Sequence, residues 1–205
     1  MTIAKDKPLL MVVSAPSGAG KTTLCDLLLK EFQHMTRSIS CTTREKRPGE
    51  THGRDYYFIT LQEYEKCLQR GKFLESAVVH GHHYGTPRAP VLAALASGRD
   101  VLLVIDVQGA GIIRNCIKKG SHKGLKAAFA DVFIVPPSVG ELKKRLLKRG
   151  KDHPDEIRTR LKNAAREMKA GRFFRYMVVN DRLEQAYKQL RAIVIAEHCR
   201  NVKSA

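Results

Sequence analysis

The strongest structural signal in the chain is the stretch Ser14-Ala15-Pro16-Ser17-Gly18-Ala19-Gly20-Lys21-Thr22-Thr23. A short apolar run, Leu9 to Val13, comes before it, and a helical pattern with leucines on one face comes after it. A strand, a glycine-rich loop and a helix in this order form the setting of a P-loop, where backbone N–H groups and the positive end of the helix hold phosphate oxygens. The stretch therefore predicts a binding site for nucleotide phosphates.

The residues of this loop fit that chemistry with one departure. Lys21 can reach the β- and γ-phosphates of a nucleotide, and the Thr22 hydroxyl can ligate Mg²⁺. The usual pattern begins with glycine, whereas this chain has Ala15, whose Cβ is tolerated at a negative φ and costly at a positive one. An ordinary glycine turn would leave Gly-Lys-Thr at the helix start unexplained. The expected phosphate-binding residues are Ala15, Pro16, Ser17, Gly18, Ala19, Gly20, Lys21, Thr22 and Thr23.

The composition predicts one globular domain with anionic partners. The chain has 205 residues, of which 43% are hydrophobic, enough for a single sizeable core. Its net charge of +17 points to nucleotides, nucleic acid or acidic surfaces, and charge alone does not choose among them. No apolar run is long enough for a signal peptide or a membrane span, and five scattered cysteines without C-x-x-C spacing predict free thiols in the cytoplasm rather than a zinc site.

Strand and helix patterns alternate along most of the chain. Val101 to Ile105 is a continuous apolar run, typical of a strand buried on both faces of a parallel sheet, and further strands are expected at 132–135 and 177–179. This alternation predicts an α/β fold with a mostly parallel sheet flanked by helices. Between Thr36 and Gly85 the strands are shorter, and we interpret this block as a small lobe inserted into the core.

Local signals fix several element boundaries. Thr60 to Glu63 and Ser138 to Glu141 are capping boxes that predict helix starts, and the first of these helices is expected to stop at Gly71. Residues 73–79 are expected to form a strand, and His80 to Pro87 a loop or a hairpin.

Two groups of polar residues outside the loop are candidates for chemistry. Asp106 ends the buried strand as a Walker B carboxylate does, although an aspartate in this position is often a helix cap. Arg44 and Arg47 stand among hydroxyl residues, with Tyr56 beyond a glycine turn, and arginine forks with tyrosine hydroxyls suit a phosphate. A solvated basic loop is the alternative for the arginines.

The segment Thr42 to Phe58, written T-T-R-x-x-R-x-G-E-x-x-G-x-D-Y-x-F, resembles the signature of the guanylate kinase family of P-loop nucleoside monophosphate kinases. The loop S-A-P-S-G-A-G-K-T-T, the later G-x-x-Y-G-T and D-x-Q-G, and an arginine-rich segment match in order and spacing. The resemblance extends from about Leu9 to Leu190, and alanine at position 15 is not foreign to the family.

This resemblance implies a P-loop NTPase-type fold within one domain, 1–205. Its core would comprise 1–36, 87–139 and 161–205, with a GMP-binding lobe at 37–86 and a helical lid at 140–160. The implied activity is transfer of the γ-phosphoryl group of ATP to GMP or dGMP with Mg²⁺, which serves guanine nucleotide recycling in the cytoplasm. ATP and GMP are then the expected partners, with no specific nucleic acid and no membrane.

The resemblance also implies roles for single residues in the acceptor site. Glu75 would pair with the guanine N1–H and 2-amino group, and Asp106 would lie near the base and the metal. One carboxylate can accept both guanine donors, whereas adenine has an unprotonated N1, and an unpaired buried polar group costs about 1–3 kcal/mol. The implied GMP-binding residues are Ser40, Arg44, Arg47, Tyr56, Glu75, Tyr84, Thr86 and Asp106.

On the donor side, the resemblance implies catalytic Lys21, Arg44, Arg149 and Arg160, because arginines and lysines stabilise the charge of a transferring phosphoryl group. Arg145 and Asn180 would lie near ATP, and Thr22 and Asp106 near Mg²⁺. The chain departs from the family at Val104, where many members have a second aspartate.

Three alternatives remain open at this point. A P-loop kinase for another small phosphate would not need Glu75 together with Ser40 and Thr86. A non-catalytic binding module would typically have a degraded P-loop, and the P-loop is intact here. The alternative of an RNA-binding protein is supported by the net charge alone.

The histidines at positions 80–83 do not indicate a metal site. His80, His82 and His83 lack an acid or cysteine at ligand spacing, so no metal site is expected there. Oligomeric state and the preference between GMP and dGMP are left open.

Overall fold

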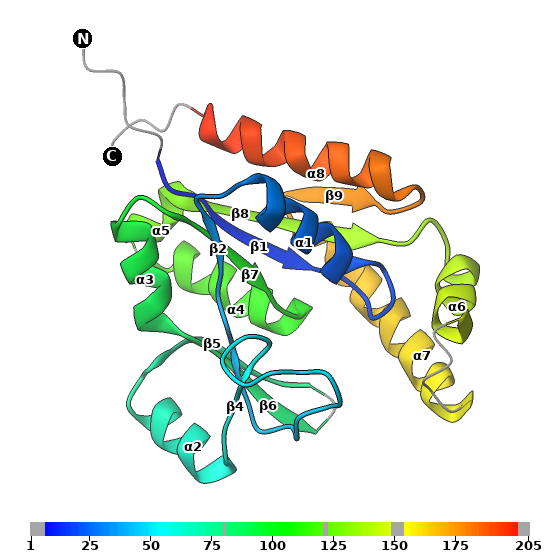
Figure 1. The fold of residues 1–205 in the computed structure, drawn as a ribbon, viewed down its shortest axis with the longest axis horizontal. Coiled ribbons are helices and arrows are strands. Elements are labelled where there is room, and N and C mark those ends of the chain that lie inside the picture. Colours follow the sequence, from blue (N-terminus) through cyan, green and yellow to red (C-terminus); the bar gives the residue numbers. More distant parts are fainter. Residues whose placement is uncertain (1–6, 80, 121–122, 149–153, 201–205) are drawn as a thin grey trace.

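A five-stranded parallel sheet forms the centre of the protein (Figure 1). The computed structural model describes residues 7–79, 81–120, 123–148 and 154–200. The strand order is β2-β7-β1-β8-β9, and each neighbouring pair is parallel. This confirms the predicted α/β class. The strands are β1 (Leu10–Ser14), β2 (Met35–Arg37), β7 (Asp100–Val104), β8 (Phe129–Val135) and β9 (Tyr176–Val179).

Helices cover both faces of this sheet. Met11 and Val13 of β1 pack in one cluster with α1 and α8, whereas Leu10 and Val12 pack in another with α3, α4 and α5. Because both faces are buried, β1 is apolar up to Ser14 and β7 is apolar after Asp100, rather than alternating. The helices are α1 (Lys21–Glu31), α3 (Arg88–Ala96), α4 (Val107–Lys118), α5 (Lys123–Ala128) and α8 (Leu183–His198).

A second, four-stranded sheet with the order β4-β3-β6-β5 lies below the main sheet in Figure 1. The strands β5 and β6 form an antiparallel hairpin, β3 is antiparallel to β6, and β4 is parallel to β3. Tyr64 packs on Phe73 and Cys41 in a small core of its own. The elements are β3 (Cys41–Thr42), β4 (Tyr57–Phe58), α2 (Leu61–Gln69), β5 (Phe73–Val79) and β6 (His82–Pro87).

The capping predictions are confirmed at Thr60 and hold in part at Ser138. The Thr60 hydroxyl accepts from the Glu63 N–H at 3.2 Å, and the Glu63 carboxylate accepts from the Thr60 N–H at 2.8 Å. The Ser138 hydroxyl accepts from the Glu141 N–H at 3.0 Å, while the Glu141 carboxylate accepts from Arg145. These caps start α2 and α6 (Val139–Lys148).

Some elements differ from expectation. The edge strand β2 and the helix α5 were not predicted, whereas the hairpin alternative expected at 80–87 is confirmed by the antiparallel pairing of β5 with β6. β2 has three residues, of which Thr36 and Arg37 are half-buried, so it leaves no apolar run to detect. The helix α7 (Pro154–Ala170), which a short 3₁₀ turn (Gly171–Phe173) follows, runs through the expected boundary between lid and core at residues 160 and 161. Among the described residues no helix is both long and apolar enough to cross a bilayer.

Candidate active site

The loop predicted to bind phosphate joins the carboxyl end of β1 to α1. Gly18 and Gly20 have positive φ values of 91° and 88°, and Gly20 caps α1 without a side-chain hydrogen bond. A Cβ on Gly20 would lie 2.3 Å from Nδ2 of Asn180, which donates to the Ala19 carbonyl at 2.8 Å. Glycine at position 20 is therefore needed both for its backbone angle and for the close approach of Asn180.

Lys21 lies between the loop and the next strand. Its Nζ donates to the Ile105 carbonyl at 3.3 Å, directly beyond the end of β7. Desolvation lowers the pKa of Lys21, although the nearby Cys25, Asp106 and Glu167 act in the opposite direction. Within the described residues, the Lys21 ammonium group is therefore held by a backbone carbonyl rather than by a carboxylate.

The helices α6 and α7 contact the loop from the other side. Leu142 and Leu146 of α6 are buried and would meet a Cβ on Gly18 at 3.0 Å. Arg160 of α7 donates from Nη1 to the Ser17 hydroxyl at 3.3 Å. The predicted catalytic Arg160 is thus beside the P-loop, whereas Arg149 lies outside the described residues.

Arg145 and Asn180 are joined by a hydrogen bond. Arg145 Nη1 donates to the Asn180 carbonyl at 2.9 Å, Nη2 donates to the Asp181 carbonyl at 3.3 Å, and Nε donates to Glu141 at 3.1 Å. Asn180 is buried, and its side chain holds the Ala19 carbonyl. Both residues predicted to lie near ATP therefore contribute to the position of the loop and of α6.

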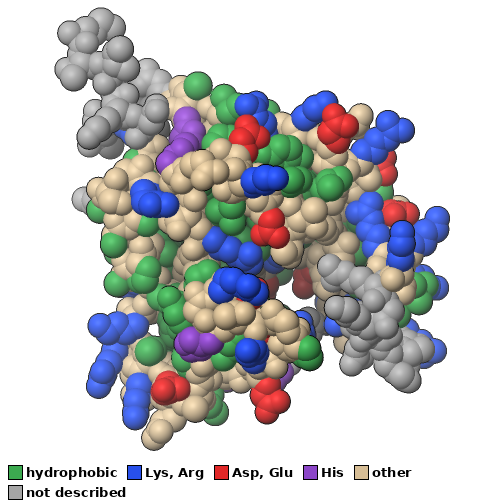
Figure 2. Space-filling model, in the orientation of Figure 1, with side chains coloured by type: hydrophobic (Ala, Val, Ile, Leu, Met, Phe, Trp, Pro, Cys, Tyr) green, Lys and Arg blue, Asp and Glu red, His purple; other side chains and the backbone are tan. Residues whose placement is uncertain are grey.

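A cavity of about 180 Å³ opens beside Lys21, between the main sheet and the second sheet. Figure 2 shows a hollow in this region with Lys and Arg side chains beside it. The cavity brings together residues from the P-loop, both sheets and the segment after β7. Its lining consists of Lys21, Ser40, Tyr56, Glu75, Val79, Tyr84, Val104, Ile105 and Asp106.

Glu75 is the buried acid of this cavity, with 5% of its surface exposed. The Thr86 hydroxyl donates to its Oε1 at 2.6 Å, and the Ser40 and Thr86 hydroxyls are 3.4 Å apart. Desolvation raises the pKa of Glu75 to about 7; the Thr86 hydrogen bond opposes this, and the charge of Asp106 adds to it. A Cβ on Gly109 would lie 2.6 Å from Glu75 Oε2, so glycine in α4 leaves room for the carboxylate.

The two predicted phosphate-binding arginines differ in their surroundings. Arg44 is nearly buried, and its Nη2 donates to both carboxylate oxygens of Glu50, at 2.7 and 2.9 Å. Its guanidinium lies 5.7 Å from the Tyr56 ring centre. Arg47 is exposed, and its backbone N–H donates to Glu50 at 2.9 Å. The structure thus holds Arg44 beside the cavity and leaves the Arg47 side chain at the surface.

Asp106 and Thr22 are the residues expected near Mg²⁺. Asp106 caps α4, because its Oδ1 accepts from the Gly109 N–H at 2.9 Å, and it also lines the cavity. The helix-cap alternative for Asp106 is therefore confirmed, alongside its position in the cavity wall. Thr22 is exposed at the start of α1. A carboxylate and a hydroxyl are hard oxygen ligands, which fit Mg²⁺. Val104 gives the cavity an apolar wall at the position where the family resemblance led us to expect an acid.

Sequence reasoning gave no role to two acids that the structure places here. Glu50 holds Arg44, and hydrogen bonds from Arg44 and the Arg47 backbone lower the pKa of Glu50 against the effect of its burial. Burial raises the pKa of Glu167 in α7, which faces Lys21 and Asp106. Glu167 is the only acidic residue from 157 to 180, a segment rich in basic residues, and this isolation is a signal in the sequence that could have identified it.

Of the histidines at positions 80–83, His83 packs on the Tyr64 ring, with 5.0 Å between the ring centres, and His80 lies outside the described residues.

Comparisons with known proteins agree over nearly the whole chain. A guanylate kinase family model matches residues 7–197. A guanylate kinase of Oleidesulfovibrio alaskensis is 47% identical over 188 residues, which are 92% of this chain and 87% of the relative. One of Geobacter metallireducens is 40% identical over 97% of this chain and 94% of its own length. The crystal structure of guanylate kinase from Anaplasma phagocytophilum has a TM-score of 0.76 and 30% identity, and covers 96% of this chain and 89% of its own. The chain therefore belongs to the guanylate kinase family.

Proposed function

We propose that this protein is an ATP:GMP phosphotransferase, which moves the γ-phosphoryl group of ATP onto GMP and releases ADP and GDP. The observation that carries the proposal is the position of Glu75, buried beside Thr86 and Ser40, in the same cavity as Lys21 of the P-loop. An acceptor base and a donor phosphate can then lie on the two sides of one cavity.

Guanine selectivity follows from the chemistry of Glu75. In its ionised form the carboxylate accepts hydrogen bonds from the guanine N1–H and 2-amino group together. Adenine would place the lone pair of N1 against the same oxygens and leave a buried acceptor unpaired, at a cost of about 1–3 kcal/mol. Thr86, which donates to Glu75, and Ser40 orient the carboxylate and offer further hydrogen bonds to the base.

Arginine and lysine side chains stabilise the transferring group. Lys21 and the loop N–H groups hold the ATP phosphates, Arg44 holds the GMP phosphate with Tyr56 and Tyr84, and Arg160 approaches from α7. The transition state is loose, with charge spread over the equatorial oxygens, so these cations lower its energy by position and charge. The GMP phosphate is already an anionic nucleophile, so no general base is needed.

Thr22 and Asp106 are the residues that would hold Mg²⁺. When bound with ATP, the ion offsets the negative charge of the phosphates and aligns them for transfer. The hydrogen bond from the Gly109 N–H fixes one Asp106 carboxylate oxygen, and the residue lines the cavity.

The proposal also assigns a function to each part of the chain. Residues 37–86 form the GMP-binding lobe, 140–160 form a lid that carries Arg145 and Arg149, and the remainder is the core. Closure of lobe and lid over the two nucleotides excludes water, which would otherwise take the phosphoryl group. We place the enzyme in the cytoplasm, which is supported by five cysteines in the free form, and we propose GMP or dGMP as the phosphoryl acceptor.

The proposal is tested by comparing GMP, AMP, CMP and UMP as phosphoryl acceptors in a coupled assay. We expect GMP to be preferred strongly, and Glu75→Gln to lower kcat/KM for GMP by at least about tenfold, since a buried charge-assisted contact is lost. Glu65→Gln, which changes an exposed acid of α2 in the same lobe, is the matched control. Equal use of AMP by the unaltered protein would overturn the guanine site, and transfer to a different small phosphate would favour another P-loop kinase.

A further inference from the structure

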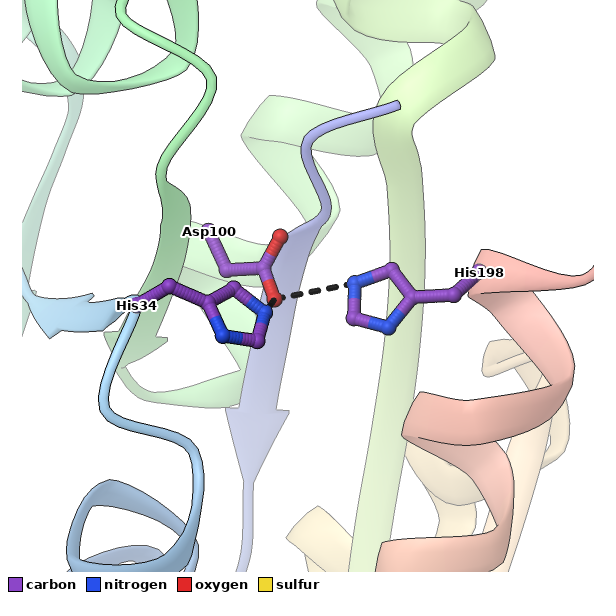
Figure 3. A group of neighbouring side chains, drawn as sticks. All are labelled: His34, Asp100 and His198. Atoms are coloured by element: carbon purple, nitrogen blue, oxygen red, sulfur yellow. Dashed lines mark ion pairs between the residues drawn. The ribbon is translucent and has the colours of Figure 1, made fainter. Parts of the chain in front are cut away.

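Two histidines and one aspartate from three separate segments meet at the end of the main sheet away from the P-loop (Figure 3). Asp100 is the first residue of β7, His34 lies between α1 and β2, and His198 is the last residue of α8. The two imidazoles point at the Asp100 carboxylate, with Nε2 to Oδ2 distances of 3.1 Å for His34 and 2.9 Å for His198. We name these three residues the His-Asp-His cluster.

The carboxylate at the centre of the cluster is buried, with 1% of the residue exposed. Asp100 Oδ1 accepts from the Leu9 N–H at 2.8 Å, which fixes the carboxylate on the neighbouring strand. Oδ2 is buried and has no hydrogen bond from the described residues, and its partners are the two imidazoles, each of which forms an ion pair with it only when protonated. A buried carboxylate oxygen without a hydrogen bond costs free energy, and such groups in native proteins generally have a ligand or a function.

We propose that the His-Asp-His cluster is a binding site for a divalent transition metal ion, with Zn²⁺ as the first candidate. The three ligand atoms all lie within 4.8 Å of one another. Zn²⁺ bonds of about 2.0–2.2 Å to imidazole nitrogen and carboxylate oxygen place neighbouring ligand atoms about 3.3 Å apart in a tetrahedron, close to the two Asp–His distances. The two imidazole nitrogens lie within 4.8 Å of each other, so the remaining pair of ligand atoms is also close enough to share one ion after adjustment of the side chains.

The ligand types select the class of metal. Two imidazole nitrogens and one carboxylate suit Zn²⁺, Co²⁺ or Ni²⁺, whereas Mg²⁺ and Ca²⁺ take oxygen ligands. His34 is exposed over 57% of its side chain, so an ion can enter from solvent and a water can fill the fourth position. The hydrogen bond from Leu9 to Asp100 supports the carboxylate from behind, as outer-shell contacts commonly do at metal sites.

The predicted effect of the metal is to link the α1–β2 connection, β7 and the end of α8. Because the cluster lies at the opposite end of the parallel sheet from the P-loop, the ion would stabilise the fold without taking part in phosphoryl transfer. It is also distinct in chemistry from the Mg²⁺ that accompanies ATP.

The test is a titration of the full chain, stripped with EDTA and free of nucleotide, with Co²⁺ and Zn²⁺. Co²⁺ binding is followed by its visible absorption bands, and Zn²⁺ by metal content after gel filtration and by thermal unfolding. The variant is His34→Gln, chosen because its side chain is exposed and its replacement leaves the core unchanged. His82→Gln and Cys199→Ser are the matched controls, since His82 is an exposed histidine elsewhere and Cys199 follows His198.

We expect one ion per chain, an increased midpoint of thermal unfolding, and at least a tenfold loss of affinity in His34→Gln, because one of three protein ligands is gone. Asp100→Asn keeps an acceptor for Leu9 and should lose binding further. GMP phosphorylation by His34→Gln should equal that of the unaltered protein. Failure to bind either ion, equal binding by His34→Gln, or a loss caused by His82→Gln or Cys199→Ser in its place would overturn the proposal.

Discussion

At the scale of the residue, Glu75 combines burial with a proposed role, recognition of guanine, that requires its charge. Its pKa of about 7, raised mainly by desolvation, means that the carboxyl group is partly protonated near neutral pH before GMP binds. Recognition of the two guanine donors needs the ionised form. Binding of GMP is therefore expected to be coupled to the release of a proton from this one side chain.

We predict that the dissociation constant for GMP rises as the pH falls below 7, by about tenfold at pH 6 relative to pH well above 7, because one proton must leave for each GMP bound. Isothermal titration across pH 5.5 to 8.5 measures this. The phosphate of GMP also ionises, near pH 6, and adds a pH dependence of its own. Glu75→Gln is the control, because it keeps the effect of the phosphate and removes that of the Glu75 carboxyl group. Identical pH profiles for the variant and the unaltered protein would contradict the assignment to Glu75.

The same shift predicts how the ligand-free protein responds to pH. The folded state holds this proton up to about pH 7, whereas the unfolded chain releases it near the ordinary value of 4.5. Between these values the folded state binds more protons, so the free energy of unfolding falls as the pH rises through the window, by on the order of 3 kcal/mol from this group. Urea unfolding of Glu75→Gln and of the unaltered protein at pH 5 and pH 8 isolates that contribution, and an equal pH slope in both proteins would exclude it.

Lys21 provides the second prediction at this scale. We expect Lys21→Ala to reduce phosphoryl transfer to near zero, because it removes the cation that holds the β- and γ-phosphates, while GMP affinity stays within a few-fold. Steady-state turnover and GMP titration are the two measurements. Transfer at nearly the original rate would show that the P-loop lysine is not needed for the chemistry.

Some residues of the candidate sites could be predicted from the sequence, whereas others could not, because their contacts form only in the folded protein. Ser40, Glu75 and Asp106 could be assigned to one site because the resemblance to the guanylate kinase family identifies them, and all three line a single cavity in the structure. The role of Glu50 in holding Arg44 could not be predicted, since it depends on the fold of the intervening turn. The His-Asp-His cluster could not be predicted either, because its members are 66 and 98 residues apart in sequence and meet through the sheet.

At the scale of the element, the P-loop and α1 depend on the conformation of Gly20. We predict that Gly20→Ala impairs ATP binding by at least tenfold, because a Cβ would clash with Asn180 as well as strain the positive φ. Gly98→Ala is the matched control: its φ is +79°, and nothing lies within 4 Å of a Cβ there. Both variants should lose about 1 kcal/mol or more of stability from backbone strain, whereas the loss of ATP affinity should be confined to Gly20→Ala. Similar ATP affinities in the two variants would contradict this account.

The predictability of the elements followed their burial. The strands β1, β7 and β8 carry continuous apolar runs because helices cover both faces, and all three were predicted. The strand β2 was missed because it is short and lies at the sheet edge, where its residues need not be apolar. The boundary between lid and core was expected at residue 160 because the arginine-rich segment ends there in the sequence. In the structure this boundary falls within α7, a continuous helix that joins the arginine-rich segment to the core.

At the scale of the whole molecule, the charge of +17 is large for a protein whose substrates are small anions. Figure 2 shows Lys and Arg side chains over much of one face, gathered over α6 and beside the hollow at the cavity. The exposed basic residues of α6 include Lys143, Lys144 and Lys148. A field of this sign attracts nucleotides to the cavity from every direction of approach and is screened by salt over about 10 Å at 0.1 M.

We therefore predict that kcat/KM for GMP falls several-fold between about 20 and 300 mM KCl, while kcat changes little, since screening weakens encounter rather than the chemical step. A neutral osmolyte at equal osmolarity is the control for effects of the solvent. Lys143→Gln with Lys144→Gln and Lys148→Gln should reduce the salt dependence in proportion to the charge removed, without loss of the fold, because these side chains are exposed. A kcat/KM that does not respond to salt would mean that the charge serves another partner, and binding of single-stranded RNA at 150 mM KCl would then identify nucleic acid as that partner.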